Sequence, residues 1–131
     1  MILLDTHVWV NWIVKGNSSL SPAVVNAMQL ADCLAVSAIS CFEVSLLVKR
    51  GKLELPCSVD EWLLEALVNS GVDSLPVTCL IADRAVNLSD IHRDPADRII
   101  IATAIIHDIK LASMDSVFPG YQEITEQLVG Q

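Results

Sequence analysis

Four acidic residues stand beside strongly apolar segments at widely separated places in the chain: Asp5, Glu43, Asp97 and Asp115. Singly, each could be a helix cap, a first-turn acid or a turn residue. Four carboxylates brought together would repel one another unless a cation held them. Oxygen ligands suit hard cations such as Mg²⁺ or Mn²⁺, which can activate water and stabilise the leaving oxygen in phosphoryl transfer. These residue types therefore indicate metal-dependent chemistry on phosphate esters.

The segments around these acids alternate between short apolar strands and helices. We expect strands over residues 2–5, 33–37, 72–77 and 110–114, with a last short strand near 122–125. We expect helices over 7–15, 21–31, 40–50, 58–71, 78–88 and 94–108, several of which open with a capping residue. Nearly continuous apolar strands alternating with helices favour an α/β fold whose parallel sheet is covered on both faces.

This arrangement would bring the four acids to one place. Asp5 and Asp115 stand at the carboxyl ends of predicted strands, whereas Glu43 and Asp97 stand in the first turns of predicted helices. The motif Ser40-Cys41-Phe42-Glu43 also matches a capping box, which needs no catalysis. In open parallel sheets, strand ends and helix starts share the edge where functional sites form. We therefore predict that the four carboxylates converge at this edge.

Length and composition narrow the classes of protein that fit. A chain of 131 residues, 53% of them apolar, suits one domain with a sizeable core. The net charge of −8 argues against a protein that coats nucleic acid, but makes a basic protein partner plausible. The four cysteines form no paired motif, and the three histidines have no zinc-like spacing. With no basic leader and no apolar run of about 20 residues, we expect a cytoplasmic protein without a membrane span.

Four ordered motifs resemble those of PIN domains, and together they cover nearly the whole chain. They are Leu3-Leu4-Asp5-Thr6-His7, Ser37-Ala38-Ile39-Ser40-Cys41-Phe42-Glu43-Val44, the segment from His92 to Ala104 that includes His92-Arg93-Asp94-Pro95-Ala96-Asp97-Arg98, and Leu111-Ala112-Ser113-Met114-Asp115. Each motif is short, but the ordered set is specific. Within that family the chain looks most like the toxins of type II toxin–antitoxin pairs, of the VapC kind. Ser113 stands where threonine is common in the family, and it keeps the hydroxyl.

The resemblance implies a single PIN domain over residues 1–131, with a three-layer α/β/α fold and a mostly parallel central sheet. It also implies RNA cleavage that depends on Mg²⁺ or Mn²⁺, a homodimer, and inhibition by a cognate antitoxin. Catalysis and metal binding would fall to Asp5, Glu43, Asp97 and Asp115, with Asp115 acting partly through water. Asp94, just before Pro95, could be a further ligand or the cap of its helix. We expect four residues to contact the RNA substrate or a metal-bound water: Thr6, Ser113, Arg93 and Arg98.

Two other functions fit parts of the sequence. A catalytically silent PIN-like module that serves only for binding or dimerisation would have the same fold, but the complete set of acids argues against it. A phosphatase of the haloacid dehalogenase kind would carry an Asp-x-Asp pair after the first strand. Here Asp5-Thr6-His7 lacks the second acid.

Overall fold

One parallel sheet organises residues 1–130, the part of the chain that the computed structural model describes. Its strand order is β3-β2-β1-β4-β5, and each pair of neighbours runs parallel. The described strands are β1 (Ile2–Leu4), β2 (Leu34–Ser37), β3 (Val72–Leu75), β4 (Lys110–Ala112) and β5 (Leu128–Val129). All three residues of the central strand β1 are buried, as expected for a parallel strand covered on both faces.

Helices connect the strands of residues 1–130, and most of these helices begin just after a capping residue that the sequence predicts. They are α1 (Thr6–Lys15), α2 (Pro22–Leu30), α3 (Ala38–Lys49), α4 (Val59–Ala66), α5 (Cys79–Val86) and α6 (Pro95–His107). The side chains of Ser21, Ser58, Thr78 and Asp94 each accept a hydrogen bond from a backbone N–H in the first turn of the helix that follows. Such caps satisfy N–H groups that otherwise have no partner within the helix.

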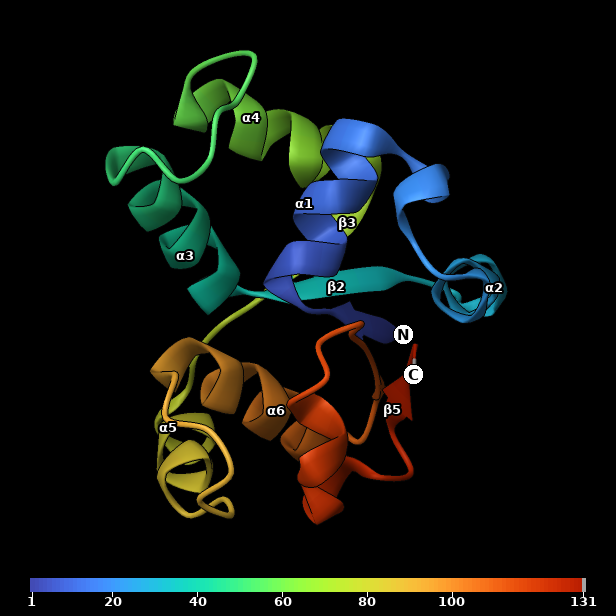
Figure 1. The fold of residues 1–131 in the computed structure, drawn as a ribbon, viewed down its shortest axis with the longest axis vertical. Helices are drawn as coiled ribbons and strands as arrows, with labels where there is room; N and C mark the ends of the chain where they lie inside the picture. Colours follow the sequence, from blue (N-terminus) through green and yellow to red (C-terminus); the bar gives the residue numbers. More distant parts are fainter. Residues whose placement is uncertain (131) are drawn as a thin grey trace.

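Two apolar clusters cover opposite faces of the sheet. On one face, Ile2 and Leu4 pack with buried side chains of α1, α2, α3 and α4. On the other face, Leu3 packs with α6 and with the C-terminal segment. Figure 1 shows the same division, with α1, α3 and α4 on one side of the sheet and α5 and α6 on the other. The expected α/β/α architecture is therefore confirmed, and its reason is the alternation of side chains along β1.

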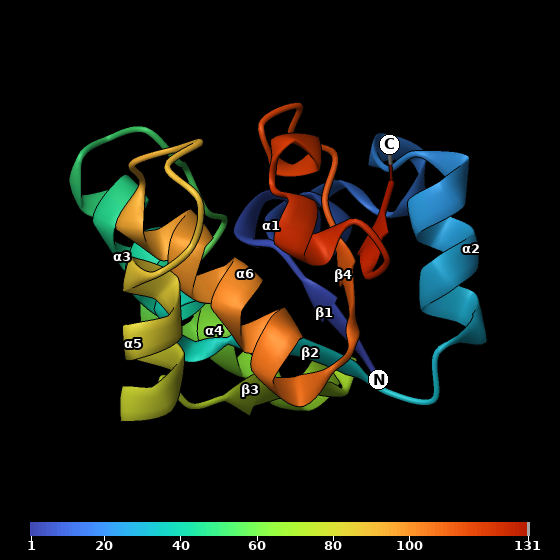
Figure 2. The ribbon, with the colours of Figure 1, turned by 90° about the horizontal axis from the view of Figure 1, so that it is seen from below.

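Helix α5 lies outside α6 rather than on the sheet. Ile81 and Ala85 of α5 pack against Ala102 of α6 in a small third cluster. Figure 2 shows α5 beside α6, with the loop of residues 87–94 connecting their ends. This loop leads directly into the first turn of α6, where Asp97 lies.

Three predicted elements differ from the structure. The helix predicted over 58–71 ends at Ala66 and is followed by a 3₁₀ helix at Val68–Ser70. The helix predicted from residue 40 begins at Ala38 and is capped by Ser37, so Glu43 lies in its second turn rather than its first. Ser40 is therefore a buried residue within the helix and not its cap. The strand predicted near 122–125 is a 3₁₀ helix at Gln122–Ile124, and the last strand forms at Leu128–Val129. In residues 1–130, no helix has the length and apolar character needed to cross a membrane.

Candidate metal centre

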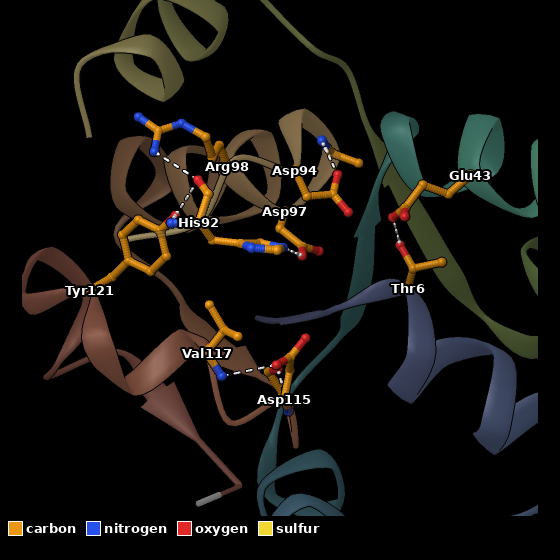
Figure 3. Close-up of polar contacts among 11 residues, drawn as sticks. Thr6, Glu43, His92, Asp94, Asp97, Arg98, Asp115, Val117 and Tyr121 are labelled. Carbon is orange, nitrogen blue, oxygen red and sulfur yellow. Dashed lines mark hydrogen bonds and ion pairs between the residues drawn. The ribbon is translucent and has the colours of Figure 1, made fainter. Parts of the chain in front are cut away.

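The four predicted acids meet at the carboxyl edge of the sheet. Asp5 follows β1 and Asp115 follows β4, while Glu43 comes from α3 and Asp97 from the first turn of α6. Each of the carboxylates in this set repels at least one other, which places them within electrostatic range of one another. Figure 3 shows Glu43, Asp97 and Asp115 directed toward a common space. The predicted convergence is therefore seen in the structure.

Asp5 combines two roles that the sequence left as alternatives. It caps α1, because its Oδ1 accepts a 2.7 Å hydrogen bond from the backbone N–H of Val8. It also belongs to the cluster, where repulsion by Asp115 adds to the effect of burial. Only 3% of Asp5 is exposed, and burial raises its pKa despite hydrogen bonds from Val8 and Ser113 that favour the charged form. A nearby cation would offset the free-energy cost of burying the charged Asp5 carboxylate.

Glu43 is held by a hydroxyl of α1. The Thr6 hydroxyl donates to Oε1 of Glu43, and the hydroxyls of Thr6 and Ser40 lie 2.8 Å apart. Because a hydroxyl has a single hydrogen, Ser40 donates to Thr6 when Thr6 donates to Glu43. Burial, followed by repulsion from Asp94 and Asp5, raises the pKa of Glu43 above its ordinary value.

The pKa of Asp97 lies well above its ordinary value of 3.8. Burial first, and then repulsion by Asp94, Glu43 and Asp115, raises its pKa to about 7. Asp94 caps α6 through a 2.9 Å hydrogen bond from the backbone N–H of Ala96, which confirms the capping alternative. Asp94 also remains close to the centre, because potential ligand atoms of His92, Asp94 and Asp97 all lie within 4.8 Å of one another.

Asp115 belongs to a tight turn after β4. Its Oδ1 accepts a 2.9 Å hydrogen bond from the backbone N–H of Val117, and its own N–H donates to the Ser113 hydroxyl at 3.1 Å. These two bonds set the orientation of the Asp115 carboxylate toward the centre (Figure 3).

The donor set fits a hard divalent cation. It consists of carboxylate oxygens with one imidazole at the rim, which is typical of sites for Mg²⁺ or Mn²⁺ rather than for soft metals. Three of the carboxylates have raised pKa values because they are buried close to other negative charges. A bound cation would offset the free-energy cost of these buried negative charges, since it would supply the largest local charge.

Three of the four residues expected to contact the substrate have hydrogen-bond partners within the protein. Thr6 and Ser113 are 3% and 0% exposed, and their hydroxyls bond to the acids named above. Arg98 donates all five of its guanidinium N–H groups to backbone carbonyls. The contact with RNA or a metal-bound water stays a prediction for these three residues, and in this structure their donors have partners within the protein. Arg93 alone is exposed, beside a groove that it lines together with residues of α5 and α6.

Two residues near the centre were missed by the sequence reasoning. His92, one of the three histidines without zinc-like spacing, places its Nε2 3.2 Å from Oδ2 of Asp97. Tyr121, from the C-terminal segment, bonds to the backbone of His92. The position of His92 two residues before Asp94, in the motif that contains Asp97, was a signal in the sequence. Nothing near Tyr121 in the sequence indicated its contact, which spans 29 residues.

Comparisons with known proteins agree with this geometry. The chain matches the PIN-domain family over residues 2–123. It is 39% identical over 115 residues to a Mycobacterium tuberculosis protein named Ribonuclease VapC22, covering 87% of this chain and 86% of that protein. Similar solved structures include a toxin–antitoxin complex from Klebsiella pneumoniae, with 21% identity, a TM-score of 0.64 and 94% of each chain covered. Another is VapBC2 from Rickettsia felis bound to a promoter DNA fragment, with 18% identity, a TM-score of 0.67, and 94% and 95% of the chains covered.

Proposed function

Because this chain belongs to the PIN-domain family, we propose that it is a metal-dependent endoribonuclease and the toxin of a type II toxin–antitoxin pair. The observation that carries this proposal is the cluster of buried carboxylates at the carboxyl edge of the sheet, with the pKa of Asp97 raised to about 7. Relatives that resemble it over most of their length are named as a ribonuclease and as toxin–antitoxin complexes.

Asp5, Glu43, Asp97 and Asp115 would hold the ion, which we propose to be Mg²⁺ or Mn²⁺. When bound, such an ion lowers the pKa of a water molecule and neutralises charge on the phosphate during in-line displacement. The chain's own groups orient the carboxylates: Thr6 holds Glu43, while Ser113 bonds to Asp5 and to the backbone of Asp115. Arg93, exposed at the groove that it lines with α5 and α6, would contact a phosphate of the RNA.

The test of this proposal is cleavage of a mixed-sequence RNA with Mg²⁺, with Mn²⁺ and with excess EDTA. Cleavage should require the divalent ion, and Asp97→Asn should abolish it. The matched control is Asp73→Asn, because Asp73 is an exposed acid on β3. Cleavage that persists in excess EDTA would eliminate the metal mechanism.

A second measurement distinguishes the proposed metal-dependent nuclease from a catalytically silent module with the same fold. A genuine metal centre stabilises the folded state when the ion binds, so Mn²⁺ should raise the melting temperature of the wild type. Asp97→Asn should reduce that increase, whereas Asp73→Asn should not. A melting temperature that does not respond to Mg²⁺ or Mn²⁺ would favour the silent module.

The proposed partners are the RNA substrate, a cognate antitoxin and a second copy of the chain. Structures of similar fold include toxin–antitoxin complexes, which supports an antitoxin partner. A second copy could cover some of the large apolar side chains that lie more than half exposed on the helices; these are Leu30, Phe42, Leu64, Val68, Leu80 and Val86. Light scattering at micromolar concentration should give twice the mass of the chain, and a monomer mass would contradict the dimer.

A further inference from the structure

The loop of residues 87–94 is tied to the body of the protein by one guanidinium. Arg98 projects from the first turns of α6, and its Nε donates to the carbonyl of Ala85 at 3.0 Å. Its Nη1 donates to Ser89 and His92, and its Nη2 donates to Val86 and Leu88, at 2.8 to 3.2 Å. The guanidinium thereby satisfies carbonyls at the end of α5 that have no helical partner. With five donors used, Arg98 fixes the path of the chain into the metal centre.

A buried hydroxyl fixes the same loop at His92. Tyr121 is 0% exposed, and its hydroxyl accepts a 3.0 Å hydrogen bond from the backbone N–H of His92. The same hydroxyl donates to the backbone carbonyl of His92 at 3.1 Å. A tyrosine hydroxyl can both donate and accept, so one side chain satisfies both backbone groups of one residue. Figure 3 shows Tyr121 and Arg98 meeting the backbone of His92.

The imidazole of His92, by contrast, points into the metal centre. Its Nε2 lies 3.2 Å from Oδ2 of Asp97, and Figure 3 shows the ring extending from the loop to that carboxylate. The His92 side chain is 36% exposed and that of Asp97 is 15% exposed. The main chain is already held by Arg98 and Tyr121, so the loop does not need the imidazole to keep its path. The ring's one polar contact in the described structure is with a predicted metal ligand.

We propose that His92 is a positioning residue that orients the Asp97 carboxylate for the divalent ion, and that Tyr121 and Arg98 hold His92 in place for this task. A carboxylate has two oxygens, so Asp97 can keep its contact with the His92 imidazole on one oxygen while the other oxygen faces the ion. Partners of this kind fix ligand orientation and strengthen metal binding. The inference rests on the proposed metal-dependent function and adds a residue outside the four acids.

The test measures Mn²⁺ affinity directly, from the electron paramagnetic resonance signal of free Mn²⁺ during titration of the purified protein. His92→Ala should weaken Mn²⁺ binding by about 10- to 100-fold, the usual cost of removing such a partner. His92→Gln should recover most of the affinity, because its amide N–H can replace the Nε2 donor. Tyr121→Phe keeps the buried ring and should cause a smaller loss in the same direction. The matched control is His107→Ala, an exposed histidine at the other end of α6, which should bind Mn²⁺ like the wild type.

Cleavage and stability measurements separate positioning from other roles. The metal-free melting temperature of His92→Ala should match that of His107→Ala, because the imidazole does not anchor the loop. At limiting Mn²⁺ the RNA cleavage rate of His92→Ala should fall, and saturating Mn²⁺ should restore it. A defect that saturating Mn²⁺ leaves unchanged would mean that His92 acts on the substrate, which overturns the proposal.

Two further outcomes would overturn the inference. Wild-type Mn²⁺ affinity in His92→Ala would show that the imidazole does not orient Asp97. Pulsed electron paramagnetic resonance could also show a ¹⁴N nucleus directly coordinated to Mn²⁺ in the wild type. If this ¹⁴N signal disappeared in His92→Ala, His92 would be a metal ligand and not a positioning residue. Failure of the proposed function looks different, because then the wild type itself would neither bind Mn²⁺ nor cleave RNA.

Discussion

The Thr6 hydroxyl, at the first residue of α1, donates a hydrogen bond to the carboxylate of Glu43 in the second turn of α3. Thr6 directly follows Asp5, so one short segment both supplies an acid to the centre and holds another acid contributed by a different helix. The Ser40 hydroxyl completes the arrangement at 2.8 Å from Thr6. The relative position of α1 and α3 therefore determines where the Glu43 carboxylate lies.

Replacement of the Thr6 hydroxyl should weaken both the fold and the metal centre. Thr6→Val keeps the shape of the side chain but leaves Ser40 and Glu43 without their partner in a buried place. Loss of a buried hydrogen-bond partner costs about 1–3 kcal/mol, so urea unfolding should show a decrease of that size. Mn²⁺ affinity should fall as well. Thr125→Val, at an exposed threonine in the C-terminal segment, is the control and should change neither quantity much.

The raised pKa of Asp97 predicts how the stability of the metal-free protein depends on pH. The pKa is about 7 in the folded protein against an ordinary value of 3.8, so the folded state holds this proton more tightly than the unfolded state. The stability that this gives is fully present below about pH 4 and is lost as pH rises through about 7. Asp5 and Glu43 shift in the same direction. Between pH 5 and 8, the free energy of unfolding should fall by on the order of 1–3 kcal/mol, after allowance for partial exposure.

Urea unfolding at both pH values, in EDTA, checks this dependence. Asp97→Asn removes the titrating group, so its unfolding free energy should change less between pH 5 and 8 than that of the wild type. It should also be more stable than the wild type at pH 8, because one buried negative charge is gone. Asp73→Asn should retain the full wild-type dependence. An equally steep dependence in Asp97→Asn would show that other groups are responsible.

The two arginines around Pro95 should behave oppositely when they are replaced. Arg98→Lys loses most of five hydrogen bonds to carbonyls and should decrease the free energy of unfolding by about 2–4 kcal/mol, since bonds to charged groups are the stronger ones. Arg93→Ala removes an exposed side chain and should leave stability nearly unchanged. It should instead raise KM for RNA. Because the contact with phosphate is electrostatic, KM should also depend less steeply on salt concentration than in the wild type. Comparison of melting curves with cleavage kinetics checks both expectations, and an unchanged KM in Arg93→Ala would remove Arg93 from the RNA contact.

The antitoxin should silence the enzyme by placing arginine in the carboxylate cluster. With a net charge of −8 and several acids at one edge, this protein favours a partner with a guanidinium, which pairs with two carboxylate oxygens at once. Arginine and metal ion would then compete for the same ligands. The purified complex should bind more weakly as Mg²⁺ rises at constant ionic strength. An affinity that is independent of Mg²⁺ would point instead to an antitoxin that only covers the entrance.

The sequence predicts the alternation of strands and helices along the chain and the edge of the sheet at which the acids meet. It also predicts the helix caps at Ser21, Ser58, Thr78 and Asp94. These features depend on short-range patterns, namely apolar runs and the residues that begin helices. The convergence of Asp5, Glu43, Asp97 and Asp115 followed from a general property of parallel sheets, in which strand ends and helix starts share one edge. No long-range contact had to be known for that inference.

The roles of the residues around the acids were decided by the tertiary structure. Arg98 has the sequence context of a phosphate ligand, yet it bonds to carbonyls of a neighbouring helix and loop. His92 became relevant because Tyr121, 29 residues away, holds its backbone beside Asp97. Hydrogen-bond partners distant in sequence leave no periodic pattern, since any polar side chain of suitable length could serve. The sequence by itself determined which acids gather, and only the packing of α5, α6 and the C-terminal segment decided which side chains orient them.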